Sequence, residues 1–177
     1  MSEFKFIFTG TPGAGKTTAI GAISDHAPVV TDASTTDELT EVKDVTTVAM
    51  DFGEITLDDG AKVHLYGTPG QERFRFMWDI IVKGGLGLII LIDHSHERPL
   101  YELDIYLDNF SSFIEDTGAV IGITRMDLAD SNAPSLDDYY EHLEKRGLTI
   151  PVFPTDVRQA DDVIMLLDSL MAMLEYS

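Results

Sequence analysis

The stretch Gly10–Thr17 (GTPGAGKT) directly follows the apolar run Phe4–Phe8, and these two segments together decide the fold. They match the pattern G-x-x-x-x-G-K-[S/T], in which a glycine-rich turn joins a buried strand to a helix. The glycines let consecutive backbone N–H groups point inward at phosphate oxygens, and the positive end of the helix dipole reinforces them. The stretch therefore predicts a phosphate-binding loop in an α/β protein.

Individual positions of this loop have predicted roles. We expect the Lys16 ammonium to reach the β- and γ-phosphates and the Thr17 hydroxyl to ligate Mg²⁺. Pro12 has no backbone N–H, so it removes one donor from the loop and stiffens the chain there. The residues of this stretch and the next position that are predicted to bind the nucleotide are Gly10, Pro12, Gly13, Ala14, Gly15, Lys16, Thr17 and Thr18.

Short apolar blocks alternate with helical patterns along the rest of the chain. Nearly unbroken runs such as Leu86–Ile92 are typical of strands buried on both faces of a parallel sheet. The blocks Val48–Leu57 and Lys62–Tyr66 are joined by a short Asp-Asp-Gly turn, which predicts a hairpin. Segment Ala27–Val45 has no apolar period and is predicted to be an extended surface loop.

These patterns predict an α/β fold of the P-loop NTPase type. We expect a three-layer sandwich with a mostly parallel six-stranded sheet, in which strand two is antiparallel, and helices on both faces. The length of 177 residues fits one domain over residues 1–177.

The composition excludes several classes of function. The chain has 12 Lys and Arg against 31 Asp and Glu, so its net charge of −19 repels nucleic acid and anionic lipid headgroups. It has no Cys, which excludes disulfides, thiolate metal sites and lipidated cysteines. No apolar run approaches the ~20 residues that a bilayer span needs. We therefore expect a cytoplasmic protein with no nucleic-acid partner and no direct membrane anchor.

A second motif, Gly67–Phe74 (GTPGQERF), follows the third apolar block. We expect the backbone N–H of Gly70 to meet a γ-phosphate and the Gln71 amide to orient an attacking water. Glutamine suits that task because its amide donates and accepts hydrogen bonds without titrating. The motif therefore predicts a hydrolytic site, and the alternative is a glycine turn that leads into an amphipathic helix.

A third motif, Thr124-Arg125-Met126-Asp127, follows the buried run Ala119–Ile123. A carboxylate at Asp127 can accept hydrogen bonds from guanine N1–H and from the N2 amine, whereas adenine has neither donor in that arrangement. Asp127 is therefore predicted to select guanine. Taken alone, Thr-x-x-Asp after a strand is also common as a helix N-cap.

With these motifs in this order, the chain resembles a Ras-superfamily small GTPase over nearly its whole length. Within that superfamily it is most similar to the bacterial MglA-type branch, whose members commonly work with roadblock-domain partners in motility and polarity. The resemblance implies that Thr47 is a Mg²⁺ ligand that senses the γ-phosphate, with Thr46 as the competing position. It also implies that Arg125 covers the base, and that a final loop meets the base through Asp156, Val157 and Arg158.

The resemblance implies a molecular switch that binds GTP or GDP with Mg²⁺ and hydrolyses GTP. Its catalytic residues would be Lys16, Thr47 and Gln71, and residues 27–47 and 68–83 would change shape to control effector binding. An activator, such as a roadblock-domain (MglB-like) protein, is implied as well. Turnover without it is expected to be slow, because no arginine adjoins Thr47 and an arginine finger is worth roughly 10³ to 10⁵ in rate. The alternatives are a nucleotide-stabilised scaffold with little turnover and an ATP-using P-loop kinase.

The sequence departs from the family pattern at several positions. Gly67 stands where an Asp usually holds Mg²⁺ through water, and Asp51 is either its substitute or a solvent-facing strand carboxylate. Thr124 stands where Asn is commoner. The apolar residues Phe74, Phe76, Met77 and Trp78 predict either a partner surface or a core contact. His94, near the end of the fourth strand, is expected to be solvated.

Overall fold

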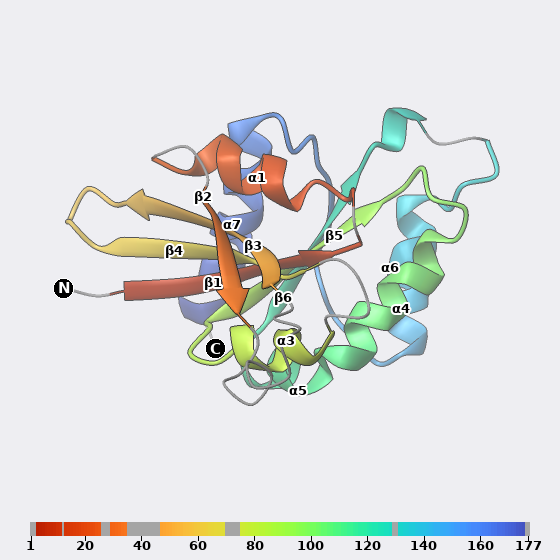
Figure 1. Cartoon of the computed structure of the whole chain (residues 1–177). Helices are drawn as coiled ribbons and strands as arrows, with labels where there is room; N and C mark the ends of the chain where they lie inside the picture. Colours follow the sequence, from red (N-terminus) through yellow and green to blue (C-terminus); the bar gives the residue numbers. More distant parts are fainter. Residues whose placement is uncertain are drawn as a thin grey trace.

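The computed structural model describes residues 3–11, 13–25, 29–34, 47–69, 75–128 and 131–175, with backbone alone for 29–34 and 47–50. The described part of the chain builds one seven-stranded sheet in the order β2-β3-β4-β1-β5-β6-β7 (Figure 1). The strands are β1 (Glu3–Gly10), β2 (Val29–Ser34), β3 (Thr47–Thr56), β4 (Lys62–Gly67), β5 (Gly87–Asp93), β6 (Ala119–Thr124) and β7 (Val152–Pro154).

The predicted hairpin is confirmed. β3 runs antiparallel to both of its neighbours, β2 and β4, while the remaining neighbours in the sheet pair in parallel. The turn between β3 and β4 needs Gly60, which has a φ of 87° and donates its N–H to the Leu57 carbonyl at 2.9 Å. A mostly parallel sheet with a single antiparallel strand is therefore observed, as the sequence predicts. That strand is β3, which corresponds to the predicted strand two at Val48–Leu57.

One expectation about the sheet is wrong. Part of the segment predicted as an extended loop, Val29–Ser34, forms strand β2 and pairs with residues 47–52 of β3. The sheet therefore has seven strands instead of six. Val29, Val30 and Thr31 are β-branched and favour extended backbone, but the polar residues that follow them hide the signal. Residues 35–46 of the predicted loop lie outside the described residues.

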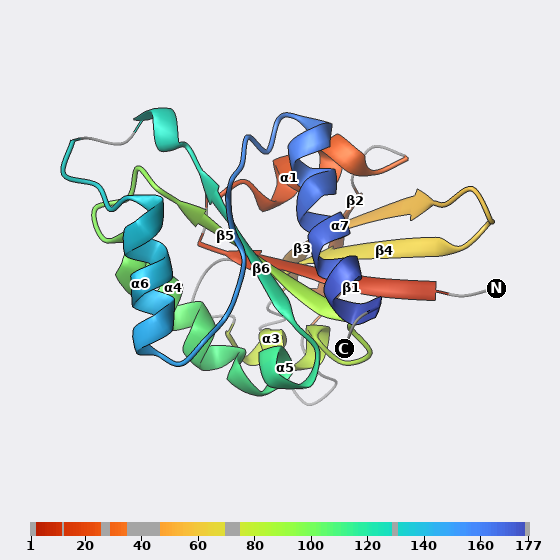
Figure 2. The same ribbon diagram turned by 180° about the vertical axis from the view of Figure 1, so that it is seen from behind.

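Helices cover both faces of the sheet, as Figures 1 and 2 show from opposite sides. α1 (Lys16–Ile23) and α7 (Ala160–Glu175) pack on one face. The other face carries α3 (Arg75–Ile81), α4 (Pro99–Asn109), α5 (Ser111–Asp116) and α6 (Leu136–Lys145). The three-layer sandwich is therefore confirmed.

β5 shows why the sheet needs both helix layers. All seven of its residues are buried. Its side chains alternate between the two cores, since Leu88, Ile90 and Ile92 belong to one cluster and Ile89 and Leu91 to the other. A strand buried on both faces reads as an unbroken apolar run, which is why its position was predictable.

The loops that matter for function follow the carboxyl ends of β1, β4, β5, β6 and β7. In an open α/β sheet these ends meet along one edge, where ligands bind. In the part of the chain that the structure covers, no helix has the length and apolar character needed to cross a membrane.

Candidate functional site

The glycine-rich turn after β1 has the backbone that its sequence predicts. Gly10 and Gly15 have positive φ values of 147° and 106°. A Cβ at Gly10 would lie 2.2 Å from the Leu91 carbonyl oxygen, and one at Gly15 would lie 2.8 Å from Cγ2 of Val157. Gly15 is also the N-cap of α1 and makes no side-chain capping bond. No N-cap side chain therefore competes with an anion for the first amides of α1.

The Lys16 side chain lies inside the curl of this turn. Its Nζ donates hydrogen bonds to the carbonyls of Gly10 at 2.6 Å and Thr11 at 3.0 Å, and the residue is 7% exposed. Burial lowers the pKa of Lys16 to about 8, and the Asp51 carboxylate opposes that shift only in part. A phosphate in the loop would supply the negative charge that favours the ammonium form.

Thr17 and Asp51 form a pair of oxygen donors beside the loop. The Thr17 hydroxyl donates to Asp51 Oδ2 at 2.7 Å. Asp51 is the register partner of Gly67 on β4, and a Cβ at Gly67 would lie 3.1 Å from Asp51 Cβ. The glycine therefore leaves room for the Asp51 carboxylate to turn towards Thr17.

This donor set fits Mg²⁺. Magnesium keeps several waters and binds through one or two protein oxygens together with substrate phosphates. Among the described residues no group of three or more His, Cys, Asp or Glu side chains is arranged to hold a metal alone. A hydroxyl and a carboxylate next to a phosphate loop therefore match the needs of a phosphate-bound cation.

A cavity of about 660 Å³ lies between the phosphate loop and the loops that follow β6 and β7. Most of its lining had been predicted from the sequence. The predicted residues that line it are Ala14, Gly15, Thr18, Thr124, Arg125, Asp127, Asp156, Val157 and Arg158. Sequence reasoning missed the others, which are Ile123, Met126, Leu128, Pro154, Thr155 and Asp162. The structure thus brings residues from three separate loops around one cavity.

Thr124 ties two of these loops together. The single hydrogen of its buried hydroxyl is shared between the Ala14 carbonyl at 3.2 Å and the Ile92 carbonyl at 3.3 Å. A threonine hydroxyl therefore makes the link to the phosphate loop at the position where Asn is commoner. The loop after β6 and the phosphate loop are held in one arrangement as a result.

The loop after β7 is ordered by its own side chains. The Asp156 carboxylate accepts hydrogen bonds from the backbone N–H, Nε and Nη2 of Arg158 at 2.9 to 3.0 Å. These bonds from Arg158 hold the pKa of Asp156 below its usual value. The backbone N–H of Asp156 donates to Asp162 at the start of α7. The loop therefore keeps its shape through contacts within the protein.

Several predicted residues remain predictions. Pro12, Gly70 and Gln71 lie outside the described residues, as do Thr46 and Phe74. Thr47 is the first residue of β3, but its side chain is outside the described set. Of the residues expected near the γ-phosphate, the structure describes the side chains of Lys16, Thr17 and Asp51.

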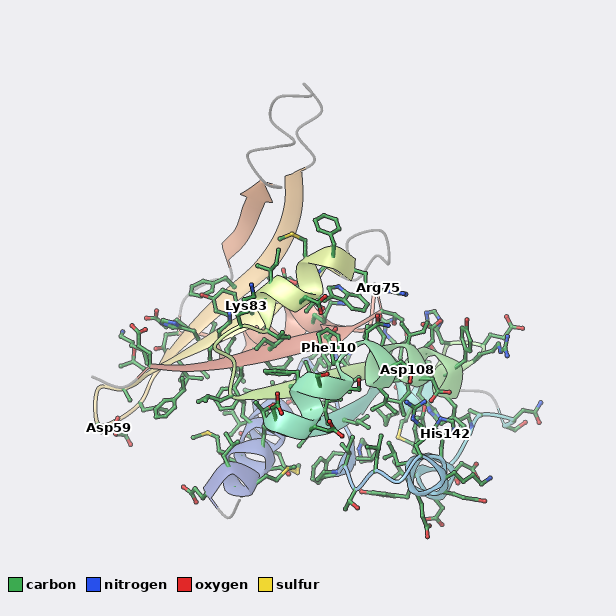
Figure 3. All side chains as sticks on the ribbon, turned by 90° about the horizontal axis from the view of Figure 1, so that it is seen from below. Asp59, Arg75, Lys83, Asp108, Phe110 and His142 are labelled. Carbon is green, nitrogen blue, oxygen red and sulfur yellow. The ribbon has the colours of Figure 1, made fainter. Side chains whose placement is uncertain are left out.

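The apolar residues of α3 are of two kinds: some pack in the core, and others are exposed on the surface. Trp78 is buried, donates from Nε1 to the Pro69 carbonyl at 2.8 Å, and stacks on Tyr106 and Phe110. Phe76 and Ile80, in contrast, are 50% and 48% exposed. Figure 3 shows this face, with Arg75 at the start of α3 and Phe110 near it.

His94 corrects another expectation. The sequence predicts a solvated histidine, but the residue is 4% exposed and its Nδ1 makes a 2.9 Å hydrogen bond with the Tyr139 hydroxyl. Burial lowers the pKa of His94, so the neutral ring is favoured. Because Tyr139 lies on α6, this bond ties that helix to the end of β5.

Comparison with known proteins places this site in context. Residues 8–151 match a family model described as conserved hypothetical ATP binding protein. An uncharacterised protein of Methanocaldococcus jannaschii, MJ1339, is 36% identical over 93 residues, which span 52% of this chain and about half of that protein (53%). Ras-related protein Rab-27A of Rattus norvegicus is 27% identical over 97% of this chain and 80% of its own length. Ras-related protein RABD2a of Arabidopsis thaliana is 25% identical over 90% of this chain and 74% of its own. These similarities support nucleotide binding and a distant, Ras-superfamily-like relationship.

Proposed function

Because the chain belongs to the family described as conserved hypothetical ATP binding protein and resembles Ras-related proteins over most of its length, we propose that it is a GTP-hydrolysing molecular switch. Residues 1–177 would form a single G domain. The observation that carries this proposal is the cavity in which Asp127, the phosphate loop and the loop after β7 meet.

We propose guanine as the base that binds in this cavity. Asp127 is an exposed carboxylate on the cavity wall, and a carboxylate accepts well from two neighbouring N–H groups. Guanine presents such a pair at N1 and N2, and adenine does not. GTP is therefore proposed over ATP, although the family description names ATP binding.

The phosphate side of the reaction rests on the residues beside the loop. Lys16 and the loop amides would hold the β- and γ-phosphates, and Thr17 with Asp51 would hold Mg²⁺. When bound, Mg²⁺ neutralises charge that develops on the phosphates. Thr47 is proposed to close on the γ-phosphate side, Gly70 to donate its N–H there, and Gln71 to orient the attacking water.

Partner binding is proposed at the two switch regions, residues 27–47 and 68–83. The exposed side chains of Phe76 and Ile80 lie in the second region, and Trp78 anchors the same helix to the core. An apolar surface on an anchored helix suits an effector that reads the position of that helix. We propose the MglA-type branch, an activator with a roadblock (MglB-like) domain, and a role in bacterial motility or polarity.

The test is phosphate release from GTP and from ATP in the presence of Mg²⁺, with and without the candidate activator. The proposal expects slow release from GTP, acceleration by the activator, and loss of both in Gln71→Ala. Faster release from ATP would support an ATP-using enzyme instead. Tight GTP binding without any release that depends on Gln71 would indicate a nucleotide-stabilised scaffold.

A further inference from the structure

Arg125 has an unusual backbone at the mouth of the cavity. Its φ is 59°, and within the described residues it is the one non-glycine residue with a positive φ. A side chain with a Cβ rarely adopts this left-handed conformation without support from its surroundings. The turn that follows is closed by the Leu128 N–H, which donates to the Arg125 carbonyl at 3.1 Å.

Asp93, the last residue of β5, holds the Arg125 side chain. Its Oδ2 accepts a 2.8 Å hydrogen bond from Arg125 Nη1. Its Oδ1 accepts from the backbone N–H and the hydroxyl of Ser95, at 2.9 and 2.6 Å. Burial disfavours the charged form of Asp93, but the bonds from Ser95 and Arg125 prevail and keep the pKa of this carboxyl below its usual value.

The position of this ion pair links it to base recognition. Asp93 and Thr124 are register partners at the ends of β5 and β6, and the His94 N–H donates to the Thr124 carbonyl at 2.9 Å. Arg125 comes directly after Thr124, and Asp127 stands two residues further on in the same turn. Asp93 itself is not among the residues that line the cavity. Arg125 and Asp127 therefore belong to one turn, and the contact between Asp93 and Arg125 lies at its start.

We propose that Asp93 is a positioning residue for base selection: its ion pair with Arg125 holds the turn 125–128 so that the Asp127 carboxylate faces the base. This inference rests on the proposed recognition of guanine by Asp127. It also accounts for arginine at position 125. Its guanidinium donates to Asp93 through Nη1 while the residue still lines the cavity.

The test compares GDP with inosine diphosphate, which lacks the N2 amine. Wild-type protein should bind GDP more tightly than inosine diphosphate, because the Asp127 carboxylate can accept a hydrogen bond from the N2 amine of guanine. Asp93→Asn removes the negative charge that holds Arg125. We expect the preference for GDP to fall roughly tenfold, which lies within the range of coupling energies measured between contacting residues. Binding of inorganic pyrophosphate, which reports on the phosphate loop, should stay within twofold of wild type, roughly the additivity error for separate sites.

The matched control is Asp104→Asn. Asp104 accepts from Arg146 Nη1 at the same distance of 2.8 Å, but this ion pair joins α4 to the end of α6, and Asp104 does not line the cavity. This variant should leave the preference for GDP unchanged. An equal loss in Asp104→Asn and Asp93→Asn would mean that the effect is general destabilisation and would overturn the inference.

A second variant guards against failure of Asp93→Asn to fold. Ser95 is exposed, lies outside the cavity lining, and donates two of the bonds that orient Asp93. Ser95→Ala removes one of them and should lower the preference in the same direction by a smaller factor. An unchanged ratio in both foldable variants overturns the inference while leaving the proposed function intact. Failure of the wild-type chain to bind either nucleotide overturns both.

Discussion

The Thr17 hydroxyl donates to the Asp51 carboxylate across 2.7 Å, and this bond joins the first turn of α1 to strand β3. Because β3 begins at Thr47, the strand that carries Asp51 also leads out of the first proposed switch region. A cation held by Thr17 and Asp51 would therefore connect the nucleotide to that region. Gly67, opposite Asp51, permits the arrangement because it has no side chain.

The first prediction concerns this pair. Asp51→Asn keeps an oxygen that can accept from Thr17 but removes the charge, so Mg²⁺ affinity should fall by about 10- to 100-fold. Titration of Mg²⁺ into the protein with a fluorescent GDP analogue measures the change. Asp58→Asn, at the exposed hairpin turn, is the control. An Asp51→Asn titration that overlays the wild-type curve would show that Asp51 is only a strand carboxylate.

The second prediction is a pH dependence caused by Lys16. The free protein holds the pKa of Lys16 at about 8, and a bound polyphosphate raises the pKa of the ammonium. The contribution of Lys16 to GDP affinity should therefore be constant below pH 8 and fall above it, by up to about tenfold for each pH unit. Lys16→Arg stays charged across this range and should show a flatter profile, whatever its absolute affinity. Parallel profiles for the two proteins would refute this origin of the dependence.

The third prediction concerns the base. Asp127→Asn replaces an acceptor by a side chain that also donates, so preference should shift from GDP towards xanthosine diphosphate, which has a carbonyl at position 2. Competition against a fluorescent nucleotide measures both affinities. Asp137→Asn, on the exposed first turn of α6, is the matched control. If Asp127→Asn retains the wild-type order of bases, the base is read by another residue.

The fourth prediction concerns stability. The Tyr140 hydroxyl donates to the Val152 carbonyl and accepts from the Val152 N–H, both at 3.0 Å, so one side chain satisfies two backbone groups of the last strand of the sheet. Tyr140→Phe should lower the free energy of unfolding by about 1 to 2 kcal/mol. Urea denaturation measures the change, with Tyr101→Phe on the exposed part of α4 as the control. Equal stability of the two variants would contradict the assignment.

The fold was predictable where the signal is local. The apolar run of β5 and the glycine-rich turn after β1 each reveal their conformation within a few residues. Most of the cavity lining followed from short motifs at strand ends, because parallel strands bring those ends to one edge. Strand β2 was missed because only its first three residues favour extended backbone, and its pairing with β3 is not visible in the sequence.

The supporting contacts could not be predicted in the same way. Asp93 reaches Arg125 from 32 residues away, and Asp51 reaches Thr17 from 34. No spacing rule connects such positions until the register of the sheet is known. His94 was misjudged for a similar reason, since its partner Tyr139 comes from α6.

Long-range ion pairs of the same kind join α4 to α6. Arg146 donates to Asp104 at 2.8 Å and also to Asp108, and His142 Nε2 lies 2.7 Å from the same Asp104 oxygen. Figure 3 shows His142 and Asp108 on these neighbouring helices. Helices α4 and α6 are thus joined by ion pairs at the surface, and residues of both helices pack in the same hydrophobic core.

The central claim is that this acidic chain binds a guanine nucleotide in the cavity beside its phosphate loop. Mass spectrometry of the small molecules released when the purified, full-length protein is denatured tests it most directly. The account predicts GDP or GTP in the wild-type sample and a strongly reduced amount from Lys16→Ala. Release of ADP or ATP in place of guanine nucleotide, or equal amounts from both proteins, would contradict it.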